Sequence, residues 1–180
     1  DGTIIPALLE ARRHGLINRL GLVTTSADSA NESRERINNL AKRMGVDSQC
    51  EYFPKSGKNE RAFLEAAEQI NPDAVIVSVP DHLHASVSIP LIEKGMHCLV
   101  VKPMASTLAE ADAMTEAAKE KGVVVQVEFH KRLDESNLLL RDAVQSGKLG
   151  DLLYAVIEYS QKKQIPRDIF RSWAEKTSIF

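Results

Sequence analysis

Two continuous apolar runs, separated by a helical segment, constrain the fold of this chain more than any other feature. The runs DAVIVSV (73–79) and MHCLVV (96–101) are rich in β-branched residues and do not alternate between polar and apolar positions. Such runs are typical of strands covered on both faces in a parallel sheet. The segment between them ends at Gly95, which suits a helix end, and Pro90 is expected to kink or divide that helix. The sequence therefore predicts a strand–helix–strand unit with a right-handed crossover.

Strand and helix patterns alternate over most of the chain, with short connections. Thr107 and Glu110 form a capping box for the clearest helix, and Asn59 and Asp81 are expected to cap two others. The expected helices cover 4–15, 31–44, 59–70, 81–95, 107–122 and 134–147. The expected strands cover 19–26, 49–53, 73–79, 96–101, 123–129 and 151–160. This alternation predicts an α/β fold with a doubly wound parallel sheet.

The composition excludes several classes of protein. A chain of 180 residues with a formal net charge of −2 lacks the basic excess that binding to nucleic acid needs. No apolar run approaches the ~20 residues that span a bilayer, so we expect no membrane segment. Cys50 and Cys98 have no metal-type spacing, so no metal site is predicted, and two reduced thiols fit a cytoplasmic protein. His97 and Cys98 lie in an apolar run and are expected in the core, whereas His14 is expected on the surface.

Ligands bind to parallel α/β sheets beyond the carboxyl ends of the strands. Lys102 directly follows the strand 96–101, and Pro103 restricts the backbone behind it. A lysine partly removed from water can hydrogen-bond to a substrate hydroxyl or carbonyl and polarise it. The alternative is a solvated lysine at a strand end. His82 and His84 stand at a helix start, where they either face a polar ligand or cap and pack the helix.

The stretch DAVIVSVPDHLHASVSIPLIEKGMHCLVVKPMA (73–105) resembles the glucose-fructose oxidoreductase / inositol dehydrogenase family almost element for element. In that family an apolar strand leads into a proline and a histidine-containing segment, and the next strand leads into a Glu-Lys-Pro motif. Pro80, His84, Lys102 and Pro103 match these motifs, whereas Val101 replaces the glutamate that lies by the nicotinamide ribose. The resemblance covers almost the whole chain and implies a Rossmann-type domain that binds NAD or NADP.

The resemblance also implies roles for individual residues. Lys102 is expected to orient the reacting oxygen and to stabilise its developing charge, and His84 is expected to line the cofactor cleft. His130 and Arg132 match the polar residue and the arginine that follow a strand near cofactor and substrate, so Lys102 and His130 are the catalytic candidates. The cofactor-binding candidates are Gly2, Thr3, Thr25, Ser26, Val79, Pro80, His84, Val101, Lys102, Pro103 and Arg132.

The first strand and the leading glycines of a phosphate-binding loop are absent, and Gly2 and Thr3 stand where the tail of that loop is expected. We therefore expect the chain to be a fragment. Residues 1–130 are expected to form the Rossmann-type domain without its first strand. Residues 131–180 are expected to form a connecting helix and the truncated start of a second α+β domain.

The choice between NAD and NADP stays open. The strand 19–26 ends without the acidic residue that usually binds the ribose 2′-hydroxyl, and it offers Thr24, Thr25 and Ser26 instead. Arg34 and Arg36 follow nearby in the sequence, so a 2′-phosphate is tolerable.

The segments HKRLD (130–134), SQKK (160–163) and FRSWAEKTS (170–178) are also similar to a subgroup that includes galacturonate reductases. This weaker likeness implies a uronic acid or related polyol as substrate. Arginine and lysine can bind a carboxylate, although a solvated charged face is the alternative. The substrate-binding candidates are Lys102, His130, Lys163 and Arg171.

The resemblance implies an oxidoreductase that transfers a hydride between nicotinamide and a carbinol or carbonyl carbon of a sugar, polyol or uronic acid. It also implies a homo-oligomer that pairs through the second domain. The family's proton-transfer His and its neighbouring Asp come from that domain, so the chain alone is expected to have little activity. The alternative is a non-catalytic dinucleotide-binding or regulatory protein, because Val101 departs from the catalytic pattern.

Overall fold

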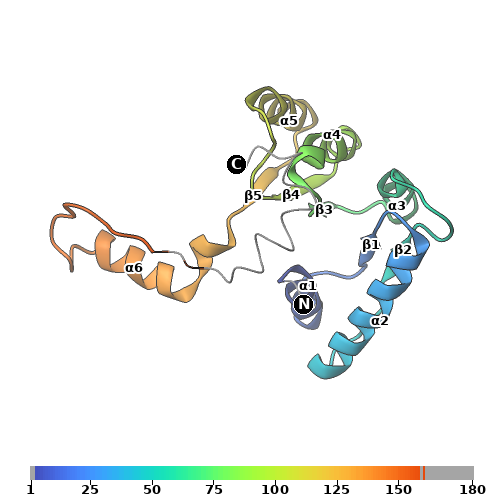
Figure 1. Ribbon diagram of the computed structural model, residues 1–180, viewed down its shortest axis with the longest axis horizontal. Coiled ribbons are helices and arrows are strands. Elements are labelled where there is room, and N and C mark those ends of the chain that lie inside the picture. Colours follow the sequence, from blue (N-terminus) through green and yellow to red (C-terminus); the bar gives the residue numbers. More distant parts are fainter. Residues whose placement is uncertain (1–2, 159, 161–180) are drawn as a thin grey trace. The chain divides into compact units, whose positions relative to one another are not determined.

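The structure is a computed structural model that describes residues 3–158 and residue 160. The chain divides into two compact units between Asp73 and Ala74. Both units contain parallel strands connected by helices, and their elements are labelled in Figure 1. The predicted α/β class with parallel strands is therefore confirmed. The predicted domain boundary after residue 130 stays a prediction.

The first unit holds a parallel pair of strands between helices. Its elements are α1 (Ile4–Arg13), β1 (Gly21–Val23), α2 (Ala27–Met44), β2 (Glu51–Phe53) and α3 (Ala62–Ile70). Neighbouring residues of a strand point to opposite faces. Tyr52 packs with Ala30 and Ile37 of α2, whereas the adjacent Phe53 packs with Ala62 and Ala66 of α3. The strand pair is thus covered on both faces, as in a doubly wound sheet.

Local sequence sets where the helices of this unit begin and end. The hydroxyl oxygen of Ser26 accepts a hydrogen bond from the backbone N–H of Ser29 (3.2 Å) at the start of α2. Gly45 ends α2 in the left-handed conformation, with φ 66°. At Gly21, a Cβ atom would lie 2.2 Å from Cδ1 of Ile70, so the absence of a side chain lets α3 approach β1 closely.

The second unit holds a three-stranded parallel sheet in the order β3-β4-β5. Its elements are β3 (Ala74–Val77), the 3₁₀ turn η1 (Asp81–Leu83), α4 (His84–Glu93), β4 (His97–Val101), α5 (Leu108–Lys121), β5 (Val125–Glu128), the 3₁₀ turn η2 (His130–Leu133) and α6 (Glu135–Gln145). Helices α4 and α5 lie against each other and against the sheet (Figure 1). Val77, Cys98 and Val100 are buried in the core, together with Leu91, Ile92, Met96 and Met114.

Two expectations about this sheet need correction. His97 was expected in the core, but it is exposed, because His97 lies on the strand face opposite to Cys98 and Val100. Leu99 and Val101 share that face and are only half-buried, so β4 shows an alternation that the sequence does not. The buried position of Cys98 and the exposed position of His14 are confirmed.

The predicted element bounds were partly wrong. Helix α3 begins at Ala62, because Asn59 caps a preceding turn by accepting the N–H of Arg61 (2.9 Å). Pro90 lies inside α4 without dividing it, since the helix is held against α5 and β4. Residues 151–158, expected to be a strand, have no strand conformation. A strand needs a partner for its backbone groups, and 152–157 are exposed. The capping box of Thr107 and Glu110 is confirmed.

Candidate functional site

The second unit brings the predicted catalytic candidates to one edge of its sheet. Val101 at the end of β4 pairs in register with Glu128 at the end of β5. Lys102 follows the first of these residues, and His130 follows the second after one intervening residue. Nδ1 of His130 lies 3.3 Å from the carboxylate oxygen Oε2 of Glu128. Two residues separated by 28 positions in the sequence thus lie at adjacent strand ends.

Lys102 is exposed, so the expectation that it is partly removed from water is wrong for this structure. The peptide bond between Lys102 and Pro103 is cis. The lysine stands at the edge where parallel sheets bind ligands. An exposed lysine at this edge can reach the oxygen of a bound substrate.

His84 is the most enclosed polar side chain at this edge, with 1% of its surface exposed. One ring nitrogen, Nδ1, lies 2.7 Å from the carbonyl oxygen of Pro103, and Nε2 lies 2.9 Å from that of Val79. These carbonyls belong to the segments that follow β4 and β3. His84 therefore joins two strand-end segments. Its predicted contact with a cofactor stays a prediction, as do those of Val79, Pro80, Val101 and Pro103.

The first unit presents a second strand-end region, formed by the segments after β1 and β2. The backbone N–H of Thr24 donates to the Phe53 carbonyl (2.9 Å), Asn59 N–H donates to the Thr25 carbonyl (2.9 Å), and Ala27 N–H donates to the Gly57 carbonyl (2.9 Å). Backbone bonds therefore hold the two segments together. The cofactor candidates Thr25 and Ser26 lie here, at the start of α2, where the backbone N–H groups favour an anionic ligand.

Sequence reasoning missed Lys58 as a candidate for this region. Lys58 forms an isolated antiparallel bridge with Ser26, so a lysine stands beside the start of α2. No local pattern marks it, because the two residues are 32 positions apart and meet only through the fold. A lysine in this place can attract a 2′-phosphate.

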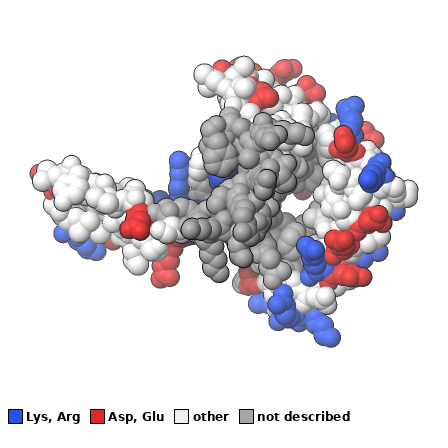
Figure 2. Space-filling view, viewed as in Figure 1, with Lys and Arg blue, Asp and Glu red and all other residues white. Residues whose placement is uncertain are grey.

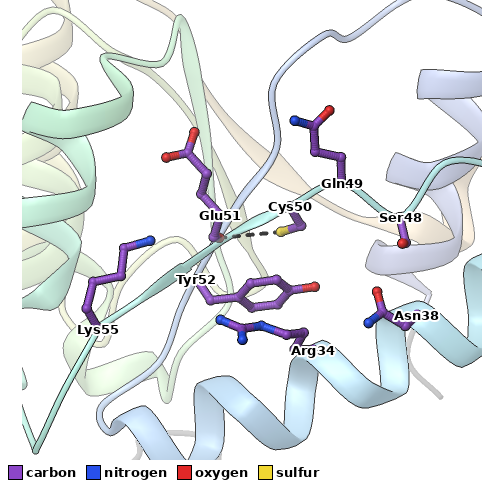
Figure 3. Close-up of a pocket in the computed structure, with 8 residues that line it drawn as sticks. All are labelled: Arg34, Asn38, Ser48, Gln49, Cys50, Glu51, Tyr52 and Lys55. Atoms are coloured by element: carbon purple, nitrogen blue, oxygen red, sulfur yellow. Dashed lines mark hydrogen bonds between the residues drawn. The ribbon is translucent and has the colours of Figure 1, made fainter.

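Arg34, in contrast, lies away from the start of α2. Its guanidinium carbon lies 4.9 Å from the ring centre of Tyr52, in a depression of about 320 Å³ that Asn38, Cys50 and Lys55 also line (Figure 3). Arg36 pairs with Glu32 (3.8 Å) on the exposed side of the same helix. Neither arginine lies at the Thr24–Ser26 segment, so Lys58 replaces them as the candidate cation for a 2′-phosphate.

The depression at Arg34 contains two weakly acidic groups. Burial raises the pKa of Tyr52 to about 12, with Cys50 adding to the effect and Arg34 opposing it. Burial likewise raises the pKa of the Cys50 thiol. The Tyr52 hydroxyl makes no hydrogen bond within the described part of the chain, and the Cys50 thiol beside it donates to the Glu51 carbonyl (3.4 Å; Figure 3). Both groups therefore stay protonated at neutral pH.

A basic groove of about 400 Å³ follows β5. It is lined by Lys131, Arg132, Asn137 and Arg141 from η2 and α6. The guanidinium of Arg132 stacks 4.3 Å from the ring centre of Phe129. Lys131 pairs with Asp134 (2.8 Å). The groove offers planar guanidinium donors that suit a carboxylate or phosphate.

The remaining predicted positions carry less information. Thr3 is exposed and precedes α1 without a side-chain capping bond. Gly2, Lys163 and Arg171 lie outside the described residues. Among the described residues, no group of His, Cys, Asp and Glu could hold a metal ion, and no helix is long and apolar enough to cross a membrane. Figure 2 shows acidic and basic side chains interspersed over the visible described surface.

Comparisons with known proteins identify the family. Residues 9–129 match the family model described as "Oxidoreductase family, NAD-binding Rossmann fold". Levoglucosan dehydrogenase of Pseudarthrobacter phenanthrenivorans is 32% identical over 129 residues, which cover 71% of this chain and 32% of that protein. The NADP(+)-dependent scyllo-inositol 2-dehydrogenase of Bacillus subtilis is 30% identical over 58% of this chain and 28% of its own length.

The structural comparison agrees with the sequence comparison. A levoglucosan dehydrogenase in complex with NADH and levoglucosan superposes with a TM-score of 0.56 at 25% identity, covering 75% of this chain and 32% of that chain. The chain thus spans about a third of the length of the relatives it matches. The chain belongs to the NAD-binding Rossmann-fold oxidoreductases of the glucose-fructose oxidoreductase / inositol dehydrogenase family.

Proposed function

We propose that the full-length protein transfers a hydride between nicotinamide and a carbinol or carbonyl carbon of a sugar, polyol or uronic acid. The observation that carries this proposal is the position of Lys102 at the end of β4, beside Glu128 and His130 at the end of β5. The named relatives support it, since they include levoglucosan dehydrogenase and 1,5-anhydro-D-fructose reductase of Ensifer adhaerens, the latter 36% identical over 52% of this chain and 28% of its own length.

The side chains have separate roles in this proposal. The Lys102 ammonium donates a hydrogen bond to the reacting oxygen and stabilises negative charge that develops there. The Glu128 carboxylate holds the imidazole of His130, which contacts the same substrate. The nicotinamide supplies the redox chemistry when it is bound. The start of α2, with Thr25, Ser26 and Lys58, is proposed to hold the adenosine end of NAD or NADP.

The basic groove supports the finer proposal that the substrate is acidic. Arg132 and Arg141 line it together, and neither has a carboxylate partner among the described residues. Two such guanidinium groups repel each other unless an anion lies between them. The carboxylate of a uronic acid fits this arrangement. The segments of the sequence that resemble the galacturonate reductase subgroup support the same substrate class.

Initial-rate measurements on the full-length protein test the function. NAD and NADP are each combined with neutral sugars, polyols and uronic acids, in both reaction directions. We expect turnover of at least one of these classes. If the protein binds a dinucleotide but turns over none of them, the non-catalytic alternative holds, which the valine at position 101 favours.

Two further proposals concern the whole protein. We propose a homo-oligomer that pairs through the segment beyond α6, where Leu153, Val156 and Ile157 are exposed. We also propose a cytoplasmic location, which the free thiols of Cys50 and Cys98 support. Light scattering and localisation of the tagged full-length protein test these proposals.

A further inference from the structure

His84 makes two hydrogen bonds that a neutral imidazole cannot make together. Its Nδ1 faces the Pro103 carbonyl oxygen at 2.7 Å, and its Nε2 faces the Val79 carbonyl oxygen at 2.9 Å. A carbonyl oxygen has no hydrogen to donate, so each ring nitrogen needs its own proton. A neutral ring carries one N–H, and its bare nitrogen would face a carbonyl lone pair. With an acceptor at each ring nitrogen, the hydrogen-bond geometry favours the doubly protonated form.

Charges near His84 are compatible with a buried cation. A buried charge needs a partner of opposite sign and hydrogen bonds to its polar atoms. Asp81 is 4% exposed, stands three residues before His84 and is the carboxylate nearest to it in the sequence. Lys102 directly precedes Pro103, whose carbonyl oxygen faces His84. From α5, the buried residues are the apolar Met114 and Ala118.

The position of the Pro103 carbonyl connects His84 to Lys102. Pro103 directly follows the lysine, and its ring restricts the backbone there. We infer that His84 is an imidazolium cation that fixes the Lys102–Pro103 segment to the segment after β3, and is thereby the positioning residue for Lys102. The positioning part of this inference rests on the proposed function. The protonation state does not depend on it.

His97 supplies a matched comparison within the same unit. Its Nδ1 accepts a hydrogen bond from the backbone N–H of Val124 (2.9 Å), so this nitrogen must be unprotonated. The two histidines thus have opposite partners: carbonyl acceptors on both sides of His84, and an N–H donor at His97. They are expected to hold different protonation states in one sample.

Nitrogen-15 NMR of the histidine side chains in the full-length protein tests the protonation state without any substitution. In one spectrum of the same sample, both ring nitrogens of His84 are expected to carry a proton, whereas His97 shows one protonated and one bare nitrogen. His84→Gln assigns the signals. A bare nitrogen on His84 under these conditions overturns the inference.

A double-mutant cycle tests the positioning role. His84→Phe keeps a ring and removes both donors, and we expect kcat to fall about tenfold or more, while the dissociation constant of the dinucleotide changes less than about threefold. In the Lys102→Ala background, His84→Phe is expected to change kcat little, because the residue it positions is absent. His14→Gln, an exposed histidine in the other unit, is the control. Equal effects in both backgrounds overturn the positioning role.

The design separates the possible failures. If His84→Phe fails to fold, His84→Gln replaces it in the same cycle. The glutamine side chain retains a hydrogen-bond donor, so we expect a smaller loss of kcat. If the parent protein turns over no sugar, polyol or uronic acid, the proposed function fails. In that case, amide hydrogen exchange at Met104 still tests the bridge, because His84→Gln is expected to raise the exchange rate there, and an unchanged rate overturns it.

Discussion

The segments that follow the strands are held in different ways in the two units. In the first unit, backbone groups join the segments after β1 and β2, through Thr24, Ala27 and Asn59. In the second unit, the side chain of His84 joins the segments after β3 and β4. Backbone bonds form with almost any side chain, whereas the second arrangement depends on one residue. The geometry of the first region therefore depends less on side-chain identity than the geometry of the second region, which depends on His84.

The largest effect is expected at Lys102, in the segment after β4 that the His84 side chain holds. In the full-length protein, Lys102→Ala is expected to lower kcat about 100-fold or more, since a charged hydrogen-bond donor to the reacting oxygen is lost. Steady-state kinetics and dinucleotide titration are the measurements, and dinucleotide binding is expected to persist. Lys121→Ala, at the exposed end of α5, is the matched control. Full activity of Lys102→Ala would remove the lysine from the mechanism.

Both units should lose stability at alkaline pH, because each contains a weak acid whose pKa is raised by burial. Burial raises the pKa of Tyr52 to about 12 in the first unit and that of Cys98 to about 11 in the second. The folded state then holds protons that the unfolded state loses, so stability is full below about pH 9 and falls as pH rises toward 12. Each group is expected to contribute about 2 kcal/mol.

Urea unfolding of the full-length protein as a function of pH measures this loss. Tyr52→Phe and Cys98→Ala are each expected to flatten the decline above about pH 9, whatever their effect on stability at neutral pH. An unchanged slope in both variants would contradict the assigned burial effect.

A smaller effect is expected on the preference between NAD and NADP, in the segments after β1 and β2 that backbone hydrogen bonds hold together. Lys58→Glu is expected to lower the affinity for NADP relative to NAD about tenfold, because a carboxylate beside the start of α2 repels the 2′-phosphate. Dissociation constants for both dinucleotides provide the measurement. Lys55→Glu, with a lysine that stacks on Phe53 (4.4 Å), is the control. An equal change of both affinities would exclude Lys58 from the selection.

The smallest effect compares helix caps in the two units. Ser26→Ala removes the hydroxyl that accepts the Ser29 N–H at α2, and Thr107→Ala removes the hydroxyl that accepts the Glu110 N–H and donates to the Glu110 carboxylate at α5. Each is expected to cost about 1 kcal/mol of unfolding free energy, with the greater loss at Thr107 because its hydroxyl also donates to a charged carboxylate. Chemical denaturation measures both, and a greater loss at Ser26 would reverse the ranking.

Local sequence patterns predicted where helices and strands occur better than they predicted what these elements pack against. The capping box at Thr107 depends on residues three positions apart, so the sequence alone was sufficient. His97 was misplaced because a strand's two faces are equivalent in an uninterrupted apolar run, and only packing against α4 selects one. The expected strand at 151–160 failed for a related reason, since a strand depends on a partner that the local sequence does not specify.

The same distinction between local and long-range information applies to the residues of the candidate site. Lys102 and His84 could be selected from the sequence, because they stand next to the apolar runs that mark the strands. The partners of His84 could not, since the two carbonyls have no side-chain identity to read. Lys58 was missed altogether, because its bridge to Ser26 is a long-range backbone contact.

The sequence by itself determined the alternation of strands and helices, the strand ends at which chemistry is possible, and the family that the motifs resemble. These properties depend on local periodicity and on side-chain identity. Only the tertiary structure decided which face of β4 is buried, which cation stands at the start of α2, and that His84 lies between two carbonyl groups. Those outcomes depend on contacts between residues far apart in the chain, which form only when the sheet and its helices pack together.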